Sequence, residues 1–205
     1  MDDPRPPDLH RKHPADSDAL GETGLPFLEQ QVLERLVHSS GDLSLGALLR
    51  FSDGACERGL EALQQGAPIL TDTAMAAAAV APMAQRSLGS EVHTVLKWAP
   101  EAAPPRSTRT AAGMEQAWRI LGQQSPLPVV LIGSAPTALE VLLQQVALGA
   151  PAPSLVIGMP VGFVGVAESK AHLAASGLDQ IRLEGTRGGA GLVAAAVNAL
   201  LRASV

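Results

Sequence analysis

Gly158-Met159-Pro160-Val161-Gly162-Phe163-Val164-Gly165-Val166-Ala167-Glu168-Ser169-Lys170 is the stretch of sequence that decides the fold. It follows a short apolar run, residues 154–157, of the kind found in buried parallel strands. Three glycines and a proline in its first eight residues are costly in a loop unless the backbone approaches something closely. Ligands of open α/β sheets bind beyond the C-terminal ends of the strands. We therefore expect a ligand against this turn, with a tight strand-to-helix connection as the alternative.

Short apolar runs alternate with helical patterns along most of the chain. This order predicts an α/β fold of three layers, in which helices cover both faces of a five-stranded parallel sheet through right-handed crossovers. Glycine-rich turns follow the last three of the predicted strands. The five predicted strands span residues 69–70, 91–96, 128–132, 154–157 and 181–183.

Composition limits the classes of protein to consider. The chain has 205 residues, 46% of them apolar, which is enough for one α/β domain with a sizeable core. A net charge of −5 without a basic block argues against a nucleic-acid partner. The single cysteine, Cys56, excludes an intramolecular disulfide and a cysteine-based zinc site, and it fits a cytoplasmic location. No apolar run approaches the length of a membrane span, and the N-terminus lacks the apolar core of a signal peptide.

Two regions differ in character. Residues 1–24 contain four prolines among charged residues, and we expect a flexible N-terminal arm there. Residues 25–205 carry the repeated pattern and should form the α/β domain.

Three positions stand out as candidate site residues. His38 should lie in the last turn of a helix that begins after Pro26 and ends at Gly41, where the helix dipole favours a protonated imidazole. The segment Thr71-Asp72-Thr73 should place a helix N-terminus at the sheet edge, where free N–H groups favour carboxylates. Arg109 should fall in the first turn of a helix, where a cation opposes the dipole, so a carboxylate partner explains it better. A solvated histidine and ordinary capping are the alternatives for the first two.

No turn carries a nucleotide signature. None contains the Gly-Lys-Ser/Thr of a phosphate loop, and none combines Gly-x-Gly-x-x-Gly with a suitably placed acidic residue. We therefore predict no nucleotide cofactor.

Several separate segments together resemble the precorrin-8X methylmutase family of cobalamin biosynthesis. The 158–170 stretch is the most specific of them. The others are residues 37–42, 66–75, 107–112 and 132–139, and Arg187-Gly188-Gly189 with residues 195–200. The chain departs from the family pattern in residues 1–24, where the usual Ser-Phe pair is not found, and in the alanines after Met75.

The resemblance implies a flavodoxin-like fold, a homodimer, and an isomerase without a metal or cofactor of its own. Its reaction would be migration of a methyl group from C-11 to C-12 of the corrin ring. Precorrin-8X would give hydrogenobyrinate, or cobalt-precorrin-8 would give cobyrinate. The family's catalytic histidine matches His38, and protonation of the conjugated ring by a general acid would lower the barrier to the shift.

The substrate carries many carboxylates on a broad, flat ring, so a net-acidic protein must bind it through local donors. Arginines and backbone N–H groups are the candidates, and glycines would let the backbone lie against the ring. The predicted substrate-binding residues are Thr71, Asp72, Thr73, Arg109, Ser134, Gly162, Gly165, Arg187, Gly188 and Gly189. Two alternatives remain open: a non-catalytic carrier that holds the product corrinoid, and a flavodoxin-like nucleotide or flavin binder.

Overall fold

The structure is a computed structural model that describes residues 20–204. The predicted arm, residues 1–24, therefore lies mostly outside the described residues. In the described part of the chain, no helix is both long and apolar enough to cross a bilayer.

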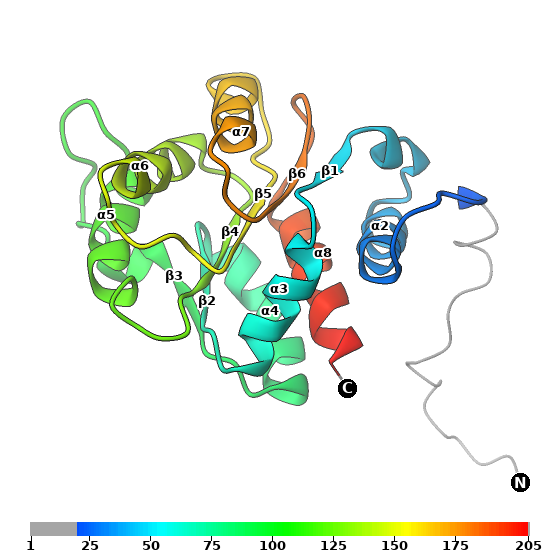
Figure 1. Ribbon diagram of the computed structural model, residues 1–205. Coiled ribbons are helices and arrows are strands. Elements are labelled where there is room, and N and C mark those ends of the chain that lie inside the picture. Colours follow the sequence, from blue (N-terminus) through cyan, green and yellow to red (C-terminus); the bar gives the residue numbers. More distant parts are fainter. Residues whose placement is uncertain (1–19, 205) are drawn as a thin grey trace, which may run out of the picture.

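A single sheet of six strands runs through the middle of the molecule (Figure 1). Its spatial order is β1-β6-β5-β4-β2-β3, and every neighbouring pair is parallel except β1 with β6. The strands are β1 (Leu49–Phe51), β2 (Ile69–Thr71), β3 (Val92–Thr94), β4 (Val129–Ile132), β5 (Leu155–Gly158) and β6 (Gln180–Leu183).

The prediction of a five-stranded, purely parallel sheet was wrong. The five predicted strands are present and mutually parallel, but β1 adds a sixth strand that runs antiparallel to β6, with Leu49 opposite Leu183. A strand of three residues is too short to show an alternating pattern, so nothing in the sequence separates it from the loop between two helices.

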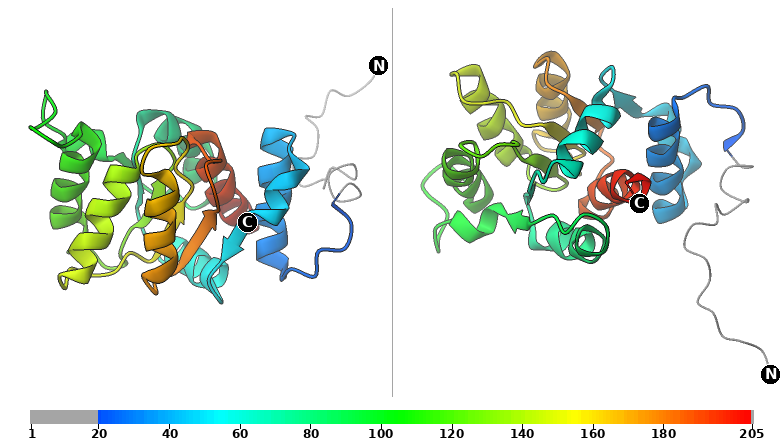
Figure 2. Two further views of the ribbon diagram at one scale, coloured as in Figure 1. Left: turned by 90° about the horizontal axis from the view of Figure 1, so that it is seen from above. Right: turned by 60° about the horizontal axis from the view of Figure 1, so that its bottom comes forward.

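Helices cover both faces of the sheet. Helices α5, α6 and α7 lie on one face, and α3, α4 and α8 lie on the other (Figure 1). Helix α2 lies outermost, against α8 (Figure 2). The helices are α2 (Phe27–Ser40), α3 (Ala55–Gln64), α4 (Ala74–Ser87), α5 (Arg109–Leu121), α6 (Pro136–Ala147), α7 (Val166–Ala175) and α8 (Ala190–Ala203), with 3₁₀ helices η1 (Leu43–Ala47) and η2 (Val95–Trp98).

The central strands read as continuous apolar runs because both of their faces are buried. In β4, Val129 and Leu131 pack into the core beneath α8, whereas Val130 and Ile132 pack into the core beneath α5 and α6. All four side chains are completely buried. Strand β4 is therefore fixed from both sides, and the residues after it leave the sheet at a well-defined place.

The direction in which the chain adds strands reverses between β2 and β4. From β2 the chain moves outward to β3, and from β4 it moves through β5 to β6 on the other side. At such a reversal the two connecting segments diverge and leave a crevice at the C-terminal ends of the strands. The candidate site residues are distributed along this edge.

Candidate functional site

The C-terminal end of α2 forms one side of the candidate site. Its apolar face, which includes Val32 and Leu36, is buried against α8. The helix ends at Gly41, whose φ is 66° and whose N–H donates to the Val37 carbonyl at 2.7 Å, as the sequence predicted. His38 lies in the last turn with an exposed side chain.

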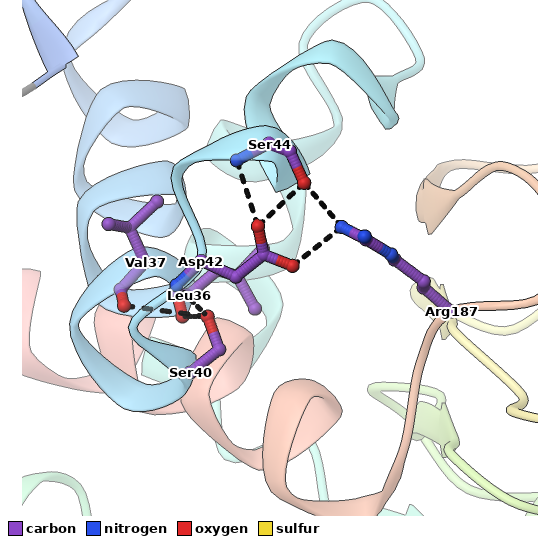
Figure 3. A network of polar contacts seen from close by, with 6 residues as sticks. All are labelled: Leu36, Val37, Ser40, Asp42, Ser44 and Arg187. Carbon is purple, nitrogen blue, oxygen red and sulfur yellow. Dashed lines mark hydrogen bonds and ion pairs between the residues drawn. The ribbon is translucent and has the colours of Figure 1, made fainter.

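A polar network connects this helix end to the far side of the site (Figure 3). The hydroxyl of Ser40 donates to the carbonyl of Leu36 at 2.8 Å and accepts the N–H of Asp42 at 3.2 Å. The Asp42 carboxylate accepts the N–H and the hydroxyl of Ser44 at 3.0 and 2.6 Å. Its other oxygen accepts Nη1 of Arg187 at 2.5 Å. The hydrogen bonds from Ser44, followed by the charge of Arg187, lower the pKa of Asp42 below its ordinary value.

Arg187 belongs to the loop between β6 and α8, which packs closely against the loop after β5. A Cβ atom on Gly188 would lie 1.9 Å from the carbonyl oxygen of Met159, so only glycine fits there. The N–H of Gly189 donates to that same carbonyl at 2.9 Å. Gly188 was predicted to let the backbone approach a ligand. The structure shows a packing role, because the absence of a side chain lets the backbone at Gly188 lie against the backbone of Met159.

Lys170 holds the β6–α8 loop from beneath. Its side chain projects from α7, and Nζ donates to the carbonyls of Gly185 and Arg187 at 2.8 and 2.6 Å. The residue is only 3% exposed, and burial lowers the pKa of its ammonium group to about 8. Lys170 thus fixes the loop that carries Arg187 at two backbone carbonyls, those of Gly185 and Arg187.

A groove of about 430 Å³ lies between these elements, within the usual size range of small-molecule sites. The tail of α2 and η1 form one wall, and the loops after β5 and β6 form the other. Phe163, at 91% exposure, stands on the second wall. The lining residues are Ser40, Asp42, Leu45, Val161, Gly162, Phe163, Thr186, Arg187, Gly188 and Leu192.

A second group of predicted residues meets at the reversal between β2 and β4. Asp72 is completely buried, and its Oδ2 accepts the N–H groups of Gly133, Ser134 and Ala135 at 3.1, 2.6 and 2.8 Å. Burial raises the pKa of this carboxyl above its ordinary value, although the three N–H donors act in the opposite direction. The N–H of Ser134, which we expected to face a substrate carboxylate, is therefore already donated to a carboxylate of the protein.

The threonines beside Asp72 also have partners within the protein. The hydroxyl of Thr71 donates to the carbonyls of Thr73 and His93 at 2.8 and 3.2 Å. Thr73 is the N-cap of α4 and accepts the N–H of Ala76 at 3.2 Å. Ordinary capping, one of the two readings of this segment, accounts for these contacts.

Arg109 and Gly165 occupy two further helix starts. Arg109 is the first residue of α5, is exposed, and donates from Nε to the carbonyl of Pro100 at 2.9 Å. The preceding residue, Thr108, lies 2.8 Å from the hydroxyl of Thr137 in α6, so the starts of α5 and α6 are neighbours. Gly165 is the N-cap of α7 with a φ of 69°.

The structure thus divides the predicted substrate-binding residues among four places. Gly162, Arg187 and Gly188 line the groove, and Gly189 follows them in the chain and donates to the carbonyl of Met159. Thr71, Asp72, Thr73 and Ser134 lie at the strand reversal, Arg109 lies at the start of α5, and Gly165 lies at the start of α7. His38 is not among the lining residues, although Ser40 and Asp42, which follow it in the chain, are.

Sequence reasoning missed Asp42, Ser44 and Phe163. The site role of Asp42 and Ser44 was not recognised because both follow the end of a predicted helix. Polar residues are common at such ends and need no further explanation. Phe163 was quoted in the decisive stretch but not assigned a role. Among residues 20–204, no group of three His, Cys, Asp or Glu side chains could hold a metal ion.

Fold and site together define a class: an α/β protein whose strand ends carry a groove lined by both apolar and polar side chains, among them an arginine. A comparison with protein families places residues 16–203 in the family described as precorrin-8X methylmutase. The chain belongs to this family.

Individual relatives agree with the family match. The chain is similar to the precorrin-8X methylmutase of Pseudomonas aeruginosa, with 42% identity over 185 residues, 86% of this chain and 85% of the relative. It is 36% identical to the cobalt-precorrin-8 methylmutase of Synechocystis over 197 residues, 89% and 88% of the two chains. Among solved structures, the precorrin-8X methylmutase of Thermus thermophilus superposes with a TM-score of 0.81, at 41% identity and 91% coverage of both chains.

Proposed function

We propose that this protein is an isomerase of cobalamin biosynthesis that moves a methyl group from C-11 to C-12 of the corrin ring. It would convert precorrin-8X to hydrogenobyrinate, or cobalt-precorrin-8 to cobyrinate. The observation that carries this proposal is the family match, which spans residues 16–203 and so includes every candidate site residue. The relatives include enzymes named for each of the two substrates.

The groove suits the chemistry of such a substrate. A corrin ring presents wide apolar faces and a periphery of carboxylates. The exposed side chains of Val161 and Phe163 offer apolar contact to a face of the ring, and Arg187 offers a cation to its periphery. His38, at the helix end that forms one wall, supplies the proton that draws electron density towards the migrating methyl group.

We further propose a homodimer whose contact includes the rim of this groove. Phe163 and Val164 are 91% and 88% exposed, and neighbouring Val161 is 47% exposed. Apolar side chains grouped at a site rim commonly mark a surface that a partner covers. Sedimentation equilibrium measures the mass of the assembly, and a mass of one chain at all concentrations would contradict the dimer.

The remaining proposals concern architecture and location. The parallel strands follow the order 2-1-3-4-5 when numbered without β1, which is the order of flavodoxin-like folds, so we assign the domain of residues 25–205 to that group. The lone cysteine, Cys56, is buried and unpaired by any disulfide, which fits a cytoplasmic protein.

The test is incubation with precorrin-8X and with cobalt-precorrin-8 separately, followed by absorption spectra. A shift to the product chromophore identifies both the activity and the preferred substrate. Binding of hydrogenobyrinate without conversion of either substrate would favour a product carrier instead.

We predict that His38→Ala abolishes turnover and still binds the corrinoid, because the imidazole donates a proton and the groove is built by other residues. His172→Ala is the matched control, since His172 also lies in the last turn of a helix with an exposed side chain, and it should turn over normally. Near-normal turnover of His38→Ala would remove His38 from the mechanism.

A further inference from the structure

In the part of the chain that the structure describes, the Arg187 guanidinium is bound through one nitrogen, Nη1. Nη1 donates both to Oδ2 of Asp42 and to the hydroxyl of Ser44. Within residues 20–204, no hydrogen bond uses Nε or Nη2 of this guanidinium, and the side chain is 49% exposed at the groove. The Nε–Nη2 edge of an arginine is the geometry that binds a carboxylate with two parallel hydrogen bonds.

The contacts among Ser44, Asp42 and Arg187 use each donor and acceptor in a defined way. The hydroxyl of Ser44 has a single proton, which it donates to Oδ1 of Asp42 at 2.6 Å, so its lone pairs face Nη1 of Arg187. Oδ1 also accepts the N–H of Ser44, which leaves Oδ2 for the arginine. The carboxylate and the hydroxyl thus form one acceptor for Nη1, with Ser44 orienting the carboxylate (Figure 3).

The other end of the Arg187 side chain is also fixed. Its own carbonyl accepts Nζ of the buried Lys170 at 2.6 Å, and the next residue, Gly188, is packed against the backbone of Met159. An arginine loses considerable side-chain freedom when it binds a ligand. Here the contacts within the protein already restrict the side chain at both ends, so less of this entropy remains to be lost on binding.

The same acceptor is attached to the helix end that carries His38. The N–H of Asp42 donates to Ser40, whose hydroxyl donates to the carbonyl of Leu36 in the last turns of α2. A displacement of this helix end would move Asp42, and with it the anchored nitrogen of Arg187. One hydrogen-bond network through Ser40 and Asp42 therefore connects the helix end that carries His38 to Arg187, and it fixes the position of one relative to the other.

We propose that Asp42, supported by Ser44, is a positioning residue that holds Arg187 by Nη1 so that its Nε–Nη2 edge receives one carboxylate of the corrinoid. This inference rests on the proposed function. Asp42 does not touch the ligand in this arrangement. It acts only through Arg187, and this makes the inference testable by a double-mutant cycle.

The experiment measures the dissociation constant of hydrogenobyrinate by spectral titration, together with KM and kcat, for wild type and variants. Asp42→Asn should raise the dissociation constant and KM by about tenfold, which corresponds to one lost charge-assisted contact, and change kcat much less. Ser44→Ala should shift both constants in the same direction by a smaller factor. The double variant Asp42→Asn/Arg187→Met should bind no more weakly than Arg187→Met alone.

Asp179→Asn is the matched control. Asp179 forms an ion pair with Arg58 at the start of β6, the opposite edge of the sheet from the groove, and it should bind and turn over like wild type. Urea unfolding of each variant separates an effect on the groove from an effect on the fold, and Ser44→Ala provides the test if Asp42→Asn does not fold.

Two results would overturn the inference. One is a dissociation constant within twofold of wild type for both Asp42→Asn and Ser44→Ala. The other is full additivity of Asp42→Asn and Arg187→Met, which would mean that Asp42 acts independently of the arginine. A wild-type protein that neither binds nor converts the corrinoid would instead contradict the proposed function, and the inference would fall with it.

Discussion

One buried oxygen of Asp72 accepts three hydrogen bonds. Its Oδ2 accepts the N–H groups of Gly133, Ser134 and Ala135, which connect the end of β4 to α6. We predict that Asp72→Ala lowers the free energy of unfolding by about 3 kcal/mol or more, because it leaves buried donors without an acceptor. Asp72→Asn keeps one oxygen acceptor and should lie between the alanine variant and wild type. Urea unfolding measures all three.

The surface pair of Arg58 and Asp179 provides the comparison for this prediction. Asp179→Asn should lower the free energy of unfolding much less than Asp72→Ala does, since both partners of this pair remain accessible to water. Equal losses for Asp72→Ala and Asp179→Asn would mean that the Asp72 contacts contribute no more than an ordinary surface ion pair.

At the residue scale, the sequence predicted where a residue lies within its helix better than it predicted which distant residue its side chain contacts. It located His38 in the last turn of a helix and Gly41 as the C-cap, because both follow from local periodicity and glycine geometry. It could not predict that Asp72 would bind Ser134, which lies 62 residues further along the chain. It could not predict that Arg187 would reach Asp42 either, because such contacts depend on the order of the strands.

At the element scale, α7 and the β6–α8 loop are joined by the ammonium group of Lys170. Burial lowers the pKa of this group from 10.5 to about 8, so between these values the unfolded chain binds more protons than the folded one. The contribution of Lys170 to stability is therefore fully present above pH 10.5 and is lost as the pH falls through about 8. We predict that the stability of wild type relative to Lys170→Met rises over this window, by at most about 1.4 kcal/mol per pH unit.

Urea unfolding at a series of pH values measures this difference. The comparison with Lys170→Met is necessary because burial raises the pKa of the Cys56 thiol to about 12, which lowers the stability of both proteins as the unfolded thiol ionises. A difference between the two proteins that stays constant from pH 7 to pH 10 would show that the Lys170 pKa is not lowered.

Helices α2 and α5 were predictable from their long periodic patterns, and β4 was predictable from a continuous apolar run between Pro126 and Gly133. Two boundaries do not follow from local sequence. Helix α4 contains Pro82, a residue that usually ends a helix, yet it continues through this proline to Ser87. Helix α3 has Gly54 as its N-cap, although the common capping residue Ser52 lies two positions earlier, because the Ser52 hydroxyl accepts the N–H of Gln180 at 2.9 Å.

At the scale of the whole molecule, a protein of net charge −5 binds a proposed substrate that carries many carboxylates. The overall field repels the ligand, so binding depends on nearby cations. We predict that Arg109→Ala weakens corrinoid binding, and that the loss is larger at about 0.01 M salt than at about 1 M, where the Debye length falls from ~30 to ~3 Å. Spectral titration at the two salt concentrations measures the effect.

Arg86→Ala is the matched control for this prediction. Arg86 also donates from Nε to the carbonyl of a proline, but it lies at the C-terminal end of α4, away from the C-terminal strand ends. Its removal should leave the affinity unchanged at both salt concentrations. An unchanged affinity for Arg109→Ala at low salt would remove Arg109 from the substrate-binding residues.

The fold class followed from the sequence because alternation of strands and helices leaves few architectures open. The sheet order, the antiparallel edge strand β1 and the groove did not, since each depends on contacts between distant segments. The groove in particular joins residues 40–45 to residues 161–163 and 186–192.

The buried Asp72 has a consequence for where a ligand can sit on this sheet. In proteins with the same arrangement of strands, the crevice where the strand order turns around is the seat of a diffusible anion, usually a phosphate. Here Oδ2 of Asp72 already accepts the N–H groups that would bind such an anion. We therefore expect a ligand to lie further along the strand ends, beside the loops after β5 and β6, where the groove opens.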